Sequence, residues 1–423
     1  MGMTMLEKIL ARCSDRQRVE TGDVVSCRVD WAVEFDLPFA RSHNRPVPNK
    51  VWDPSRIVLI LDHVVPAPTV VMADGLKAAR AFAKERGIKH FYPEGRQGIC
   101  HQLVAELGFA LPGMLLACGD SHTSASGAFN CAARGLGMME MLYILCKGET
   151  WFEVCPTVRY VLEGQLAEGV YPRDVIHHIA GVYGEHLNQN VEYVGPGLKR
   201  LDMAARQTIA TMSTELSAEF ATFAFDEQTE AYLRDRAQES YSPVESDKDA
   251  RFTEVRTINF DKLEPQVVMP HFVPHNVRPV GEVAGMKIDQ GFIGSCANGR
   301  IEDLRVAAQI LKGRSVHPDS RLIITPASTQ VAIDAAKEGL IEIFLRAGAV
   351  FTNPTCGACN GGHMGLIGAG ERCLTSSTRN FKGRMGSKDA EILMASPATV
   401  AASAVAGVIC DPRTTNQERN AGR

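Results

Sequence analysis

The chain has 423 residues, more than one hydrophobic core usually organises, so two or three domains are expected. Hydrophobic residues make up 45% of it and charged residues 22%, as is ordinary for a soluble globular protein. A net charge of -4, without any run of lysine or arginine, gives no sign of the basic surface that nucleic-acid binding needs. The amino-terminal segment lacks the apolar core and cleavage site of a signal peptide, and no apolar run is long enough to span a bilayer. We therefore expect a cytosolic protein.

The first part of the chain, residues 1–155, alternates short β-rich runs with helical patterns. The run at 55–66 ends in polar residues and proline, and the run at 114–129 continues into a Gly- and Ser-rich loop. Between them, residues 75–87 have helical spacing and a closing glycine. Alternation of this kind favours an α/β domain with largely parallel strands.

The middle part, residues 156–280, is expected to form a second α/β domain. A strand is predicted at 157–164, a helix at 172–184 and a longer helical stretch at 206–223. Residues 226–282 are richer in charge and proline, which indicates a connecting segment before the last domain.

The last part, residues 281–423, repeats the α/β pattern clearly. Its predicted elements are a strand at 287–296, a helix at 301–313, a strand at 321–327, a helix at 329–348 and a strand at 349–356. Cys296 and Cys356 therefore stand at the carboxyl ends of predicted strands. In open α/β sheets, ligands bind in the crevice beyond those ends.

Three of the twelve cysteines stand out by their surroundings. Most of the others sit singly in apolar stretches, where free cysteine packs in the core. Cys356 and Cys359 form a Cys-x-x-Cys pair within NPTCGACNGG, and Cys296 lies in the tight turn GSCANGR. Three thiolates in one crevice suit an iron–sulfur cluster, and three ligands to a four-iron cubane leave one iron open to substrate.

Other interpretations of these cysteines stay open at this point. A Cys-x-x-Cys pair also occurs as a redox dithiol or as half of a zinc site. A structural zinc site needs a fourth ligand, for which His363 in GGHMG is a candidate. Plain core packing is the remaining alternative.

Several carboxylates and imidazoles also follow predicted strands. A carboxylate bonded to an imidazole fixes its tautomer and raises its basicity, so such pairs suit proton transfer. Taken singly, each is more often a structural residue, but several at strand ends favour one shared crevice. The candidates are Asp62, His63, His101, Asp120, His122 and, in the middle part, Glu215.

Arg379 and Arg384 lie five residues apart on the expected loop TRNFKGR. A guanidinium binds a carboxylate through two parallel hydrogen bonds, so two nearby arginines suit a di- or tricarboxylate substrate. A solvated basic loop is the alternative.

With these residues in view, the sequence resembles the large subunits of isopropylmalate dehydratase and homoaconitase and, more distantly, aconitase. The resemblance covers nearly the whole chain, and its motifs arrive in the family's order and approximate spacing. They are GDVV-x-x-x-VD, DHVVPAPT, GDSHTSASGAF, IGSCANGRIEDL, NPTCGACNGGH and RNFKGR.

The resemblance implies three α/β/α domains with mainly parallel sheets around a central cluster-containing cleft. It implies that Cys296, Cys356 and Cys359 ligate a [4Fe–4S] cluster whose fourth iron acts on the substrate as a Lewis acid. It makes His63, oriented by Asp62, the proton donor to the departing hydroxyl. The supporting pairs that it implies are His101 with Asp120 and His122 with Glu215, and it makes Arg379 and Arg384 the substrate-carboxylate and cluster-proximal arginines.

The resemblance also implies a partner. Aconitases carry a fourth, swivelling domain with a catalytic serine, and the isopropylmalate-type enzymes place that domain on a separate small subunit. The chain is therefore expected to need such a subunit for dehydration and rehydration of a hydroxy di- or tricarboxylate. Isopropylmalate is the first choice of substrate; homocitrate or homoaconitate, methylmalate and dimethylmalate are the alternatives.

Four positions depart from the family pattern: Thr211, Ala297, Asn360 and Thr378. They are expected near the cluster, where they would retune its hydrogen bonding and potential. Three rivals follow from different classes: an inactive or regulatory homologue, an RNA-binding relative without a cluster, and a zinc-dependent hydrolase. The intact cysteines and the slightly acidic charge disfavour RNA binding.

Overall fold

The computed structural model describes residues 2–40 and 45–414. Contacts within the chain divide it into two compact units: unit 1 contains Met1–Gly164 and His186–Ile258, and unit 2 contains Gln165–Glu185 and Asn259–Arg423. Both units mix helices with mainly parallel sheets, which confirms the expected α/β class. The finer division into three domains, at 1–155, 156–280 and 281–423, stays a prediction.

The elements of unit 1 come, in chain order, from the two stretches of chain that form it. They are α1 (Met5–Cys13), β1 (Val24–Arg28), β2 (Trp31–Phe35), η1 (Leu37–Phe39), β3 (Ile57–Ile60), α2 (Val70–Glu85), β4 (His90–Tyr92), α3 (Cys100–Glu106), β5 (Leu115–Cys118), η3 (Ser121–Phe129), β6 (Ala132–Gly135), α4 (Met138–Lys147), β7 (Glu149–Glu153), β8 (Thr157–Glu163), β9 (Asn190–Val194), η4 (Pro196–Arg200), α6 (Met203–Ser213), η5 (Thr214–Leu216), β10 (Ala221–Phe223), α7 (Glu227–Leu233) and β11 (Glu254–Asn259).

The elements of unit 2 begin with one helix from the middle of the chain and continue after residue 258. They are α5 (Pro172–Tyr183), η6 (Phe260–Lys262), β12 (Gln266–Val268), β13 (Val277–Pro279), α8 (Val280–Val283), β14 (Gln290–Ile293), α9 (Ser295–Asn298), α10 (Ile301–Leu311), β15 (Arg321–Ile324), α11 (Thr329–Lys337), α12 (Leu340–Arg346), β16 (Val350–Phe351), η7 (Gly357–Asn360), β17 (Arg372–Thr375), β18 (Glu391–Met394) and α13 (Pro397–Ala406).

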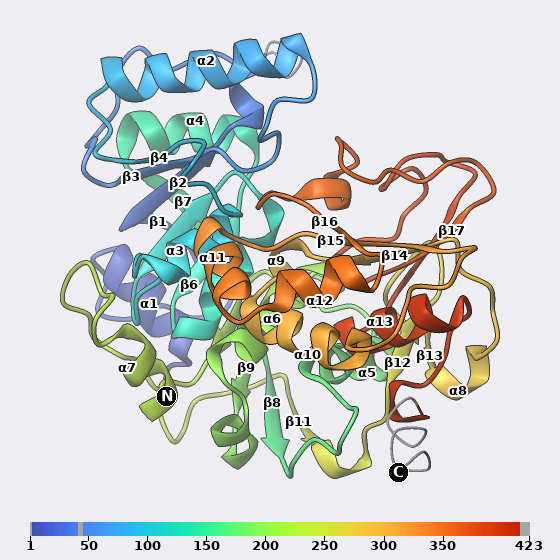
Figure 1. The fold of residues 1–423 in the computed structure, drawn as a ribbon. Helices are drawn as coiled ribbons and strands as arrows, with labels where there is room; N and C mark the ends of the chain where they lie inside the picture. The colour runs from blue at the N-terminus through green and yellow to red at the C-terminus, as the bar shows by residue number, and fades with distance from the viewer. Residues whose placement is uncertain (1, 41–44, 415–423) are drawn as a thin grey trace. The chain divides into compact units, whose positions relative to one another are not determined.

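A five-stranded parallel sheet, in the order β4-β3-β2-β5-β6, organises the first part of unit 1. β3 and β5 are apolar on both faces because side chains alternate and helices cover both sides. Ile57 and Leu59 pack in one core with residues of α1, α2 and α4. Val58 and Ile60 pack in a second core with residues of α3. Figure 1 shows α2 and α4 on the same side of β2, β3 and β4.

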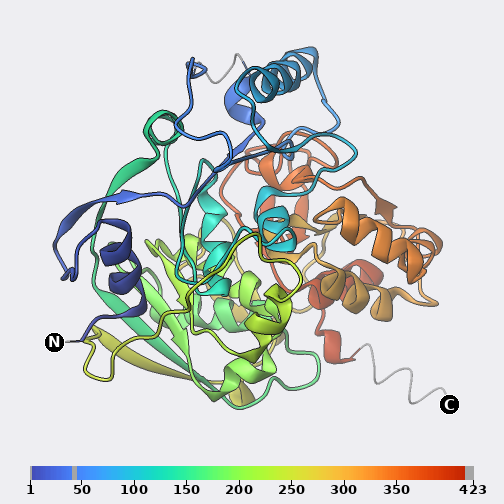
Figure 2. The same ribbon diagram turned by 90° about the vertical axis from the view of Figure 1, so that its left-hand side faces the viewer.

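Two further sheets complete unit 1. β10, β9 and β8 run parallel in a four-stranded sheet whose last member is β11. β1 pairs antiparallel with β7 in a two-stranded ribbon. α1 packs on β1 through Leu10 and Cys27, and Figure 2 shows these first two elements, in dark blue, near the amino terminus.

Unit 2 is built on a seven-stranded sheet in the order β13-β12-β18-β17-β14-β15-β16. The five strands from β18 to β16 pair in parallel, and β12 pairs antiparallel with both of its neighbours. Ile293 and Leu374 face a core with α10, α11, α12 and α13; Figure 1 shows α12 in orange and α13 in red. Phe292 and Cys373 face the opposite core, which contains Ala358 and Cys359.

Two predicted helices differ in the structure. The stretch at 329–348 forms two helices, because Gly339 takes a left-handed conformation (φ 72°) that ends α11. The stretch at 206–223 is helical only to Leu216, where Ser217 turns the chain at φ 62° and β10 follows as a strand. Within the described residues, no helix combines the length and the apolar character that crossing a membrane requires.

Candidate active site

The imidazole and carboxylate candidates of unit 1 gather where neighbouring parallel strands end. Asp62 and His63 follow β3, and Asp120 follows β5, two strands that flank β2. Carboxyl ends of parallel strands meet at one edge of a sheet, which explains why residues far apart in sequence lie together. His101 belongs to α3, His122 to η3 and Glu215 to η5.

These six residues form one connected network. His63 Nδ1 lies 2.6 Å from Asp62 Oδ1, and its Nε2 lies 3.3 Å from Asp120 Oδ2. Asp120 Oδ1 lies 2.7 Å from His101 Nε2. His122 Nε2 lies 2.7 Å from Glu215 Oε1, and the backbone N–H of His122 donates to Asp120 Oδ1 at 2.8 Å. All three imidazole–carboxylate pairs expected from the sequence are therefore in contact.

Asp120 is the electrostatic centre of the network. Burial alone would raise its pKa, but His101, His122 and His63 together hold the pKa of this carboxyl well below its usual value. Asp120 is thus an ionised acceptor that orients two imidazoles at once. A carboxylate of this kind also stabilises an imidazolium, so the network can hold a proton until it is transferred.

The sequence predictions missed Asp36, which follows β2 and joins the same network. Its side chain is fully buried, with Oδ1 3.7 Å from His63 Nδ1. Burial, and then the neighbouring Asp62, raise the pKa of Asp36 to about 7. The sequence pattern could have identified Asp36, because this carboxylate directly follows an apolar strand. Asp62 and Asp120, which were predicted, follow their strands almost as closely.

The three singled-out cysteines lie in unit 2 after the carboxyl ends of parallel strands. Cys296 is in α9, three residues after β14, and Cys359 is in η7. Cys356 precedes η7 and is five residues beyond β16, which is shorter than the predicted strand. Their exposed fractions are 6% for Cys296, 9% for Cys356 and 5% for Cys359.

The loops that carry these cysteines are held together by side-chain contacts. A Cβ placed at Gly357 would lie 3.2 Å from Thr325 Oγ1 and 3.6 Å from the Phe292 ring, so the Cys-x-x-Cys turn rests on β14 and β15. Cys359 Sγ lies 3.6 Å from Thr378 Oγ1, which links that turn to the loop after β17.

A buried arginine that the sequence predictions missed links the loop of Cys296 to the loop after β17. Arg173 of α5 donates from Nη1 to Asn298 Oδ1 and to the Ser376 carbonyl, both at 3.0 Å. Its Nη2 donates to the Ser377 carbonyl, and its Nε donates to His177 Nε2 at 2.7 Å. Burial lowers the pKa of Arg173 to about 10, so it stays charged at neutral pH. The helical pattern of 172–184 carries no sign of this role.

Among the described residues, no compact group of three or more metal-capable side chains gathers two of these cysteines, as a single-ion zinc site would need. With Zn–S bonds of about 2.3 Å, tetrahedral thiolates lie about 3.8 Å apart. In the described ranges, no group of three or more metal-capable atoms within 4.8 Å of one another contains two of the three cysteines, and none contains His363. Three nearly buried thiols after strand ends are a donor set that suits an iron–sulfur cluster, which cysteine thiolates ligate.

Unit 1 contains one compact group of metal-capable atoms, from Cys100, His101 and Cys118. Both thiols lie in the apolar core beside α3. Burial, and then Cys118, raise the pKa of the Cys100 thiol well above its usual value. Since metals bind the thiolate, core packing accounts for these two cysteines.

Arg379 and Arg384 lie in the loop after β17, as expected, and both are half-buried. The Arg384 guanidinium lies 5.6 Å from the centre of the Phe381 ring. Of the four departures, Thr378 contacts a cysteine, as described above. Thr211 Oγ1 donates to the Gln207 carbonyl of its own helix at 2.6 Å. Asn360 Oδ1 accepts a hydrogen bond from the Gly362 N–H, and Ala297 is fully buried.

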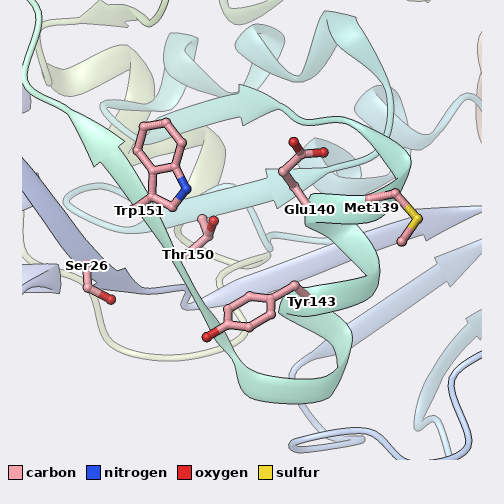
Figure 3. A pocket seen from close by; sticks show the side chains of 6 residues that line it. All are labelled: Ser26, Met139, Glu140, Tyr143, Thr150 and Trp151. Atoms are coloured by element: carbon pink, nitrogen blue, oxygen red, sulfur yellow. The ribbon is translucent and has the colours of Figure 1, made fainter.

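A surface cavity of about 360 Å³ lies apart from this chemistry, between α4 and the β1–β7 ribbon (Figure 3). Tyr143, Met139 and Glu140 reach it from α4, and Trp151 from β7. Glu140 is the one carboxylate among its lining residues and no histidine is among them, so the cavity lacks the imidazole–carboxylate pairs of the network.

Comparison with known proteins identifies the family. The model of the aconitase family (aconitate hydratase) matches residues 72–285 and 273–407. The chain therefore belongs to the aconitase family, and this membership implies a [4Fe–4S] cluster.

Curated relatives match nearly their whole length. The "3-isopropylmalate dehydratase large subunit" of Mycolicibacterium smegmatis is 53% identical over 98% of this chain and 97% of its own. "3-isopropylmalate dehydratase large subunit 1" of Methanopyrus kandleri is 44% identical over 98% and 99%. Among solved structures, aconitase X of Thermococcus kodakaraensis matches 84% of each chain with 12% identity and a TM-score of 0.48.

Proposed function

We propose that this chain is the large subunit of a [4Fe–4S]-dependent hydro-lyase that reversibly dehydrates a hydroxy di- or tricarboxylate, with 3-isopropylmalate as the favoured substrate. The observation that carries the proposal is the 53% identity to a 3-isopropylmalate dehydratase large subunit over nearly both chains. The acid–base network of unit 1 and the three cysteines of unit 2 supply side chains that this chemistry needs. A cytoplasmic location belongs to the same proposal.

Cys296, Cys356 and Cys359 would hold the cluster. Three nearly buried thiols at strand ends, with the glycines of GSCANGR and CGACNGG beside them, suit a bulky sulfur-ligated group. When bound, the cluster supplies a Lewis-acidic iron for the substrate's hydroxyl and carboxylate. Arg173 keeps the loops of Cys296 and Thr378 in place, and Thr378 contacts the sulfur of Cys359.

The network of unit 1 supplies the acid–base chemistry. His63 is the proposed donor to the departing hydroxyl: the C–O bond breaks, and the hydroxyl leaves as water with the proton of the imidazole. Asp62, 2.6 Å from His63 Nδ1, fixes the tautomer and stabilises the charged ring. Asp120 orients His101, and Glu215 orients His122.

Substrate binding and proton abstraction complete the proposal. Arg379 and Arg384 bind the substrate's carboxylates, since a guanidinium recognises a carboxylate bidentately. The base that removes the C–H proton is a serine on a small subunit, in keeping with the relatives' description as large subunits. Activity is therefore expected only from the two subunits together.

The first experiment measures iron, acid-labile sulfide and the absorption spectrum of the chain purified without oxygen and co-expressed with its small subunit. We expect about four irons per chain. Cys296→Ala should lose the cluster, whereas the matched Cys410→Ala in the same unit should keep it. A colourless protein that takes up no iron and sulfide on reconstitution would remove the Lewis acid and refute the proposal.

The substrate is tested by turnover with the complete enzyme. We expect the highest kcat/KM with 3-isopropylmalate and lower values with homoaconitate, methylmalate and dimethylmalate. Homoaconitase or a methylmalate-type dehydratase is the second candidate, because the departures at Ala297, Asn360 and Thr378 stand beside the cluster cysteines in the sequence or in space. A clear preference for one of those acids would replace the favoured substrate without removing the reaction class.

A further inference from the structure

Asp36 accepts hydrogen bonds from three successive backbone amides of the loop that carries His63. Its Oδ2 accepts from the N–H groups of Asp62 at 3.2 Å, His63 at 3.0 Å and Val64 at 3.0 Å. Three consecutive N–H groups aimed at one oxygen form an anion-binding turn, and their backbone conformation is fixed as long as the anion is present. Asp36 therefore determines how the chain leaves β3 and enters the His63 turn.

The same carboxylate faces the imidazole that Asp62 orients. Asp36 Oδ1 lies 3.7 Å from His63 Nδ1, against 2.6 Å for Asp62 Oδ1. Asp62 has a second contact, since its Oδ2 accepts from the Cys100 N–H at 2.8 Å. Two buried carboxylates thus meet one nitrogen of His63, while Asp120 meets the other at 3.3 Å.

A buried carboxylate is unfavourable unless bonds and nearby positive charge compensate for its lost hydration. Two carboxylates at one imidazole repel each other unless a proton is shared among them, and their shared partner here is His63. A purely structural anchor for three amides would need only a neutral acceptor, such as a hydroxyl or an amide oxygen. The position of the Asp36 carboxyl, 3.7 Å from His63 Nδ1, therefore points to a role beyond holding the turn.

We propose that Asp36 is a positioning residue for proton transfer, which holds the 62–64 turn through three amides and, with Asp62, orients and charges the His63 imidazole. This inference rests on the proposed function, in which His63 donates the proton. Asp36 does not touch the substrate in this scheme and acts through His63.

Asp36→Asn is the informative variant, because the amide keeps one acceptor oxygen for the turn and removes the charge. We expect kcat to fall about 10–100-fold with KM changed less than about threefold, as for residues that orient a catalytic side chain. The matched control is Asp30→Asn at the opposite end of β2, where Asp30 Oδ2 also accepts a backbone N–H, from Leu115 at 2.7 Å. Asp30→Asn should leave kcat and KM unchanged.

The pH profile separates an orienting charge from a structural anchor. The charged and titratable groups that face Asp36 are Asp62 and His63. Asp120 faces the opposite side of the His63 ring. Glu34, which lies on β2 before Asp36, forms an ion pair with Arg45. Removing a negative charge beside His63 destabilises its protonated form, so the alkaline limb of kcat should move to lower pH in Asp36→Asn. An unmoved limb together with normal kcat would overturn the proposal.

Histidine ring NMR gives a readout that needs no turnover. The His63 signal, assigned by its loss in His63→Gln, should titrate at lower pH in Asp36→Asn than in the wild-type protein and in Asp30→Asn. If the wild-type complex turns over no hydroxy acid, the proposed function fails while this measurement still decides the role of Asp36. If neither Asp36→Asn nor Asp36→Ser folds, Asp36 is a structural residue alone and the inference is overturned.

Discussion

Replacing Arg173 with methionine tests whether one buried guanidinium holds the cysteine-bearing half of the molecule together. Arg173 is fully buried and lies on α5, which is remote in sequence from its partners Asn298, Ser376 and Ser377. Methionine has a similar length and no hydrogen-bond donor, so the change removes the bonds while largely filling the space.

The expected cost follows from the contacts. Two backbone carbonyls, the Asn298 amide oxygen and His177 Nε2 each lose a donor, and an unpaired buried polar group costs about 1–3 kcal/mol. The removal of a desolvated charge offsets part of this, because burial already lowers the pKa of Arg173 to about 10. We expect a net loss of about 3–5 kcal/mol. At about 2–4 °C per kcal/mol, the melting temperature should fall by about 6–20 °C.

The assay is calorimetry on cluster-free protein, since bound ligand would add its own stabilisation. Arg305→Met is the matched control, because Arg305 is in the same unit and pairs with Glu338 on the surface, where an ion pair contributes at most about 1 kcal/mol. Arg173→Met should also take up less iron and sulfide on reconstitution. A melting temperature for Arg173→Met within about 2 °C of that of Arg305→Met would refute the assigned role.

Three further predictions follow from single side chains. Thr378→Val removes the hydroxyl 3.6 Å from Cys359 Sγ, so the reduction potential of the reconstituted cluster should become more negative; an unchanged potential in an EPR-monitored titration would contradict this. Burial raises the pKa of Asp174 to about 7, above an unfolded value of about 3.9, so its contribution to stability is lost as pH rises through about 7. The melting temperature of Asp174→Asn relative to wild type should therefore increase from about pH 5 to about pH 8, and a constant difference would count against it. Asn130→Ala should lower the free energy of unfolding, measured in urea, by about 2–4 kcal/mol, because the Asn130 side chain bonds to Phe223 O, Val244 O and Val244 N. Asn188 is exposed and has a similar positive φ, so Asn188→Ala is the control and should lower the free energy of unfolding by less than about 1 kcal/mol.

Local pattern was sufficient to predict where the chemistry stands along the chain. The apolar runs before Asp62, Asp120 and Cys296 form β3, β5 and β14, and the polar residues follow their carboxyl ends. Parallel pairing then brings such residues to one edge of each sheet. The fold class and the three imidazole–carboxylate contacts were predictable for this reason.

The remaining features depend on contacts that leave no periodic trace. The sequence alone predicts an exposed helix residue at Arg173, because its hydrogen-bond partners lie more than a hundred positions later in the chain. The three amides that bind Asp36 belong to a neighbouring strand's loop, so only the pairing of β2 with β3 reveals them. Segment 217–223 has helical composition, but Ser217 turns the chain and β10 pairs with β9, which shows tertiary contacts overriding local propensity.

The early position of α5 in the chain has a consequence for biosynthesis. Unit 2 takes this helix from Gln165–Glu185, yet the rest of unit 2 begins only at Asn259. The Ser377 carbonyl that Arg173 binds lies 204 residues further along the chain. At a synthesis rate of about 5–20 residues per second, the ribosome needs about 10–40 s to supply it. Unit 1 has its whole chain once Ile258 is made, 85 residues after Arg173, and can fold from then on, whereas α5 waits with its arginine hydrated, open to the chaperones that bind nascent chains.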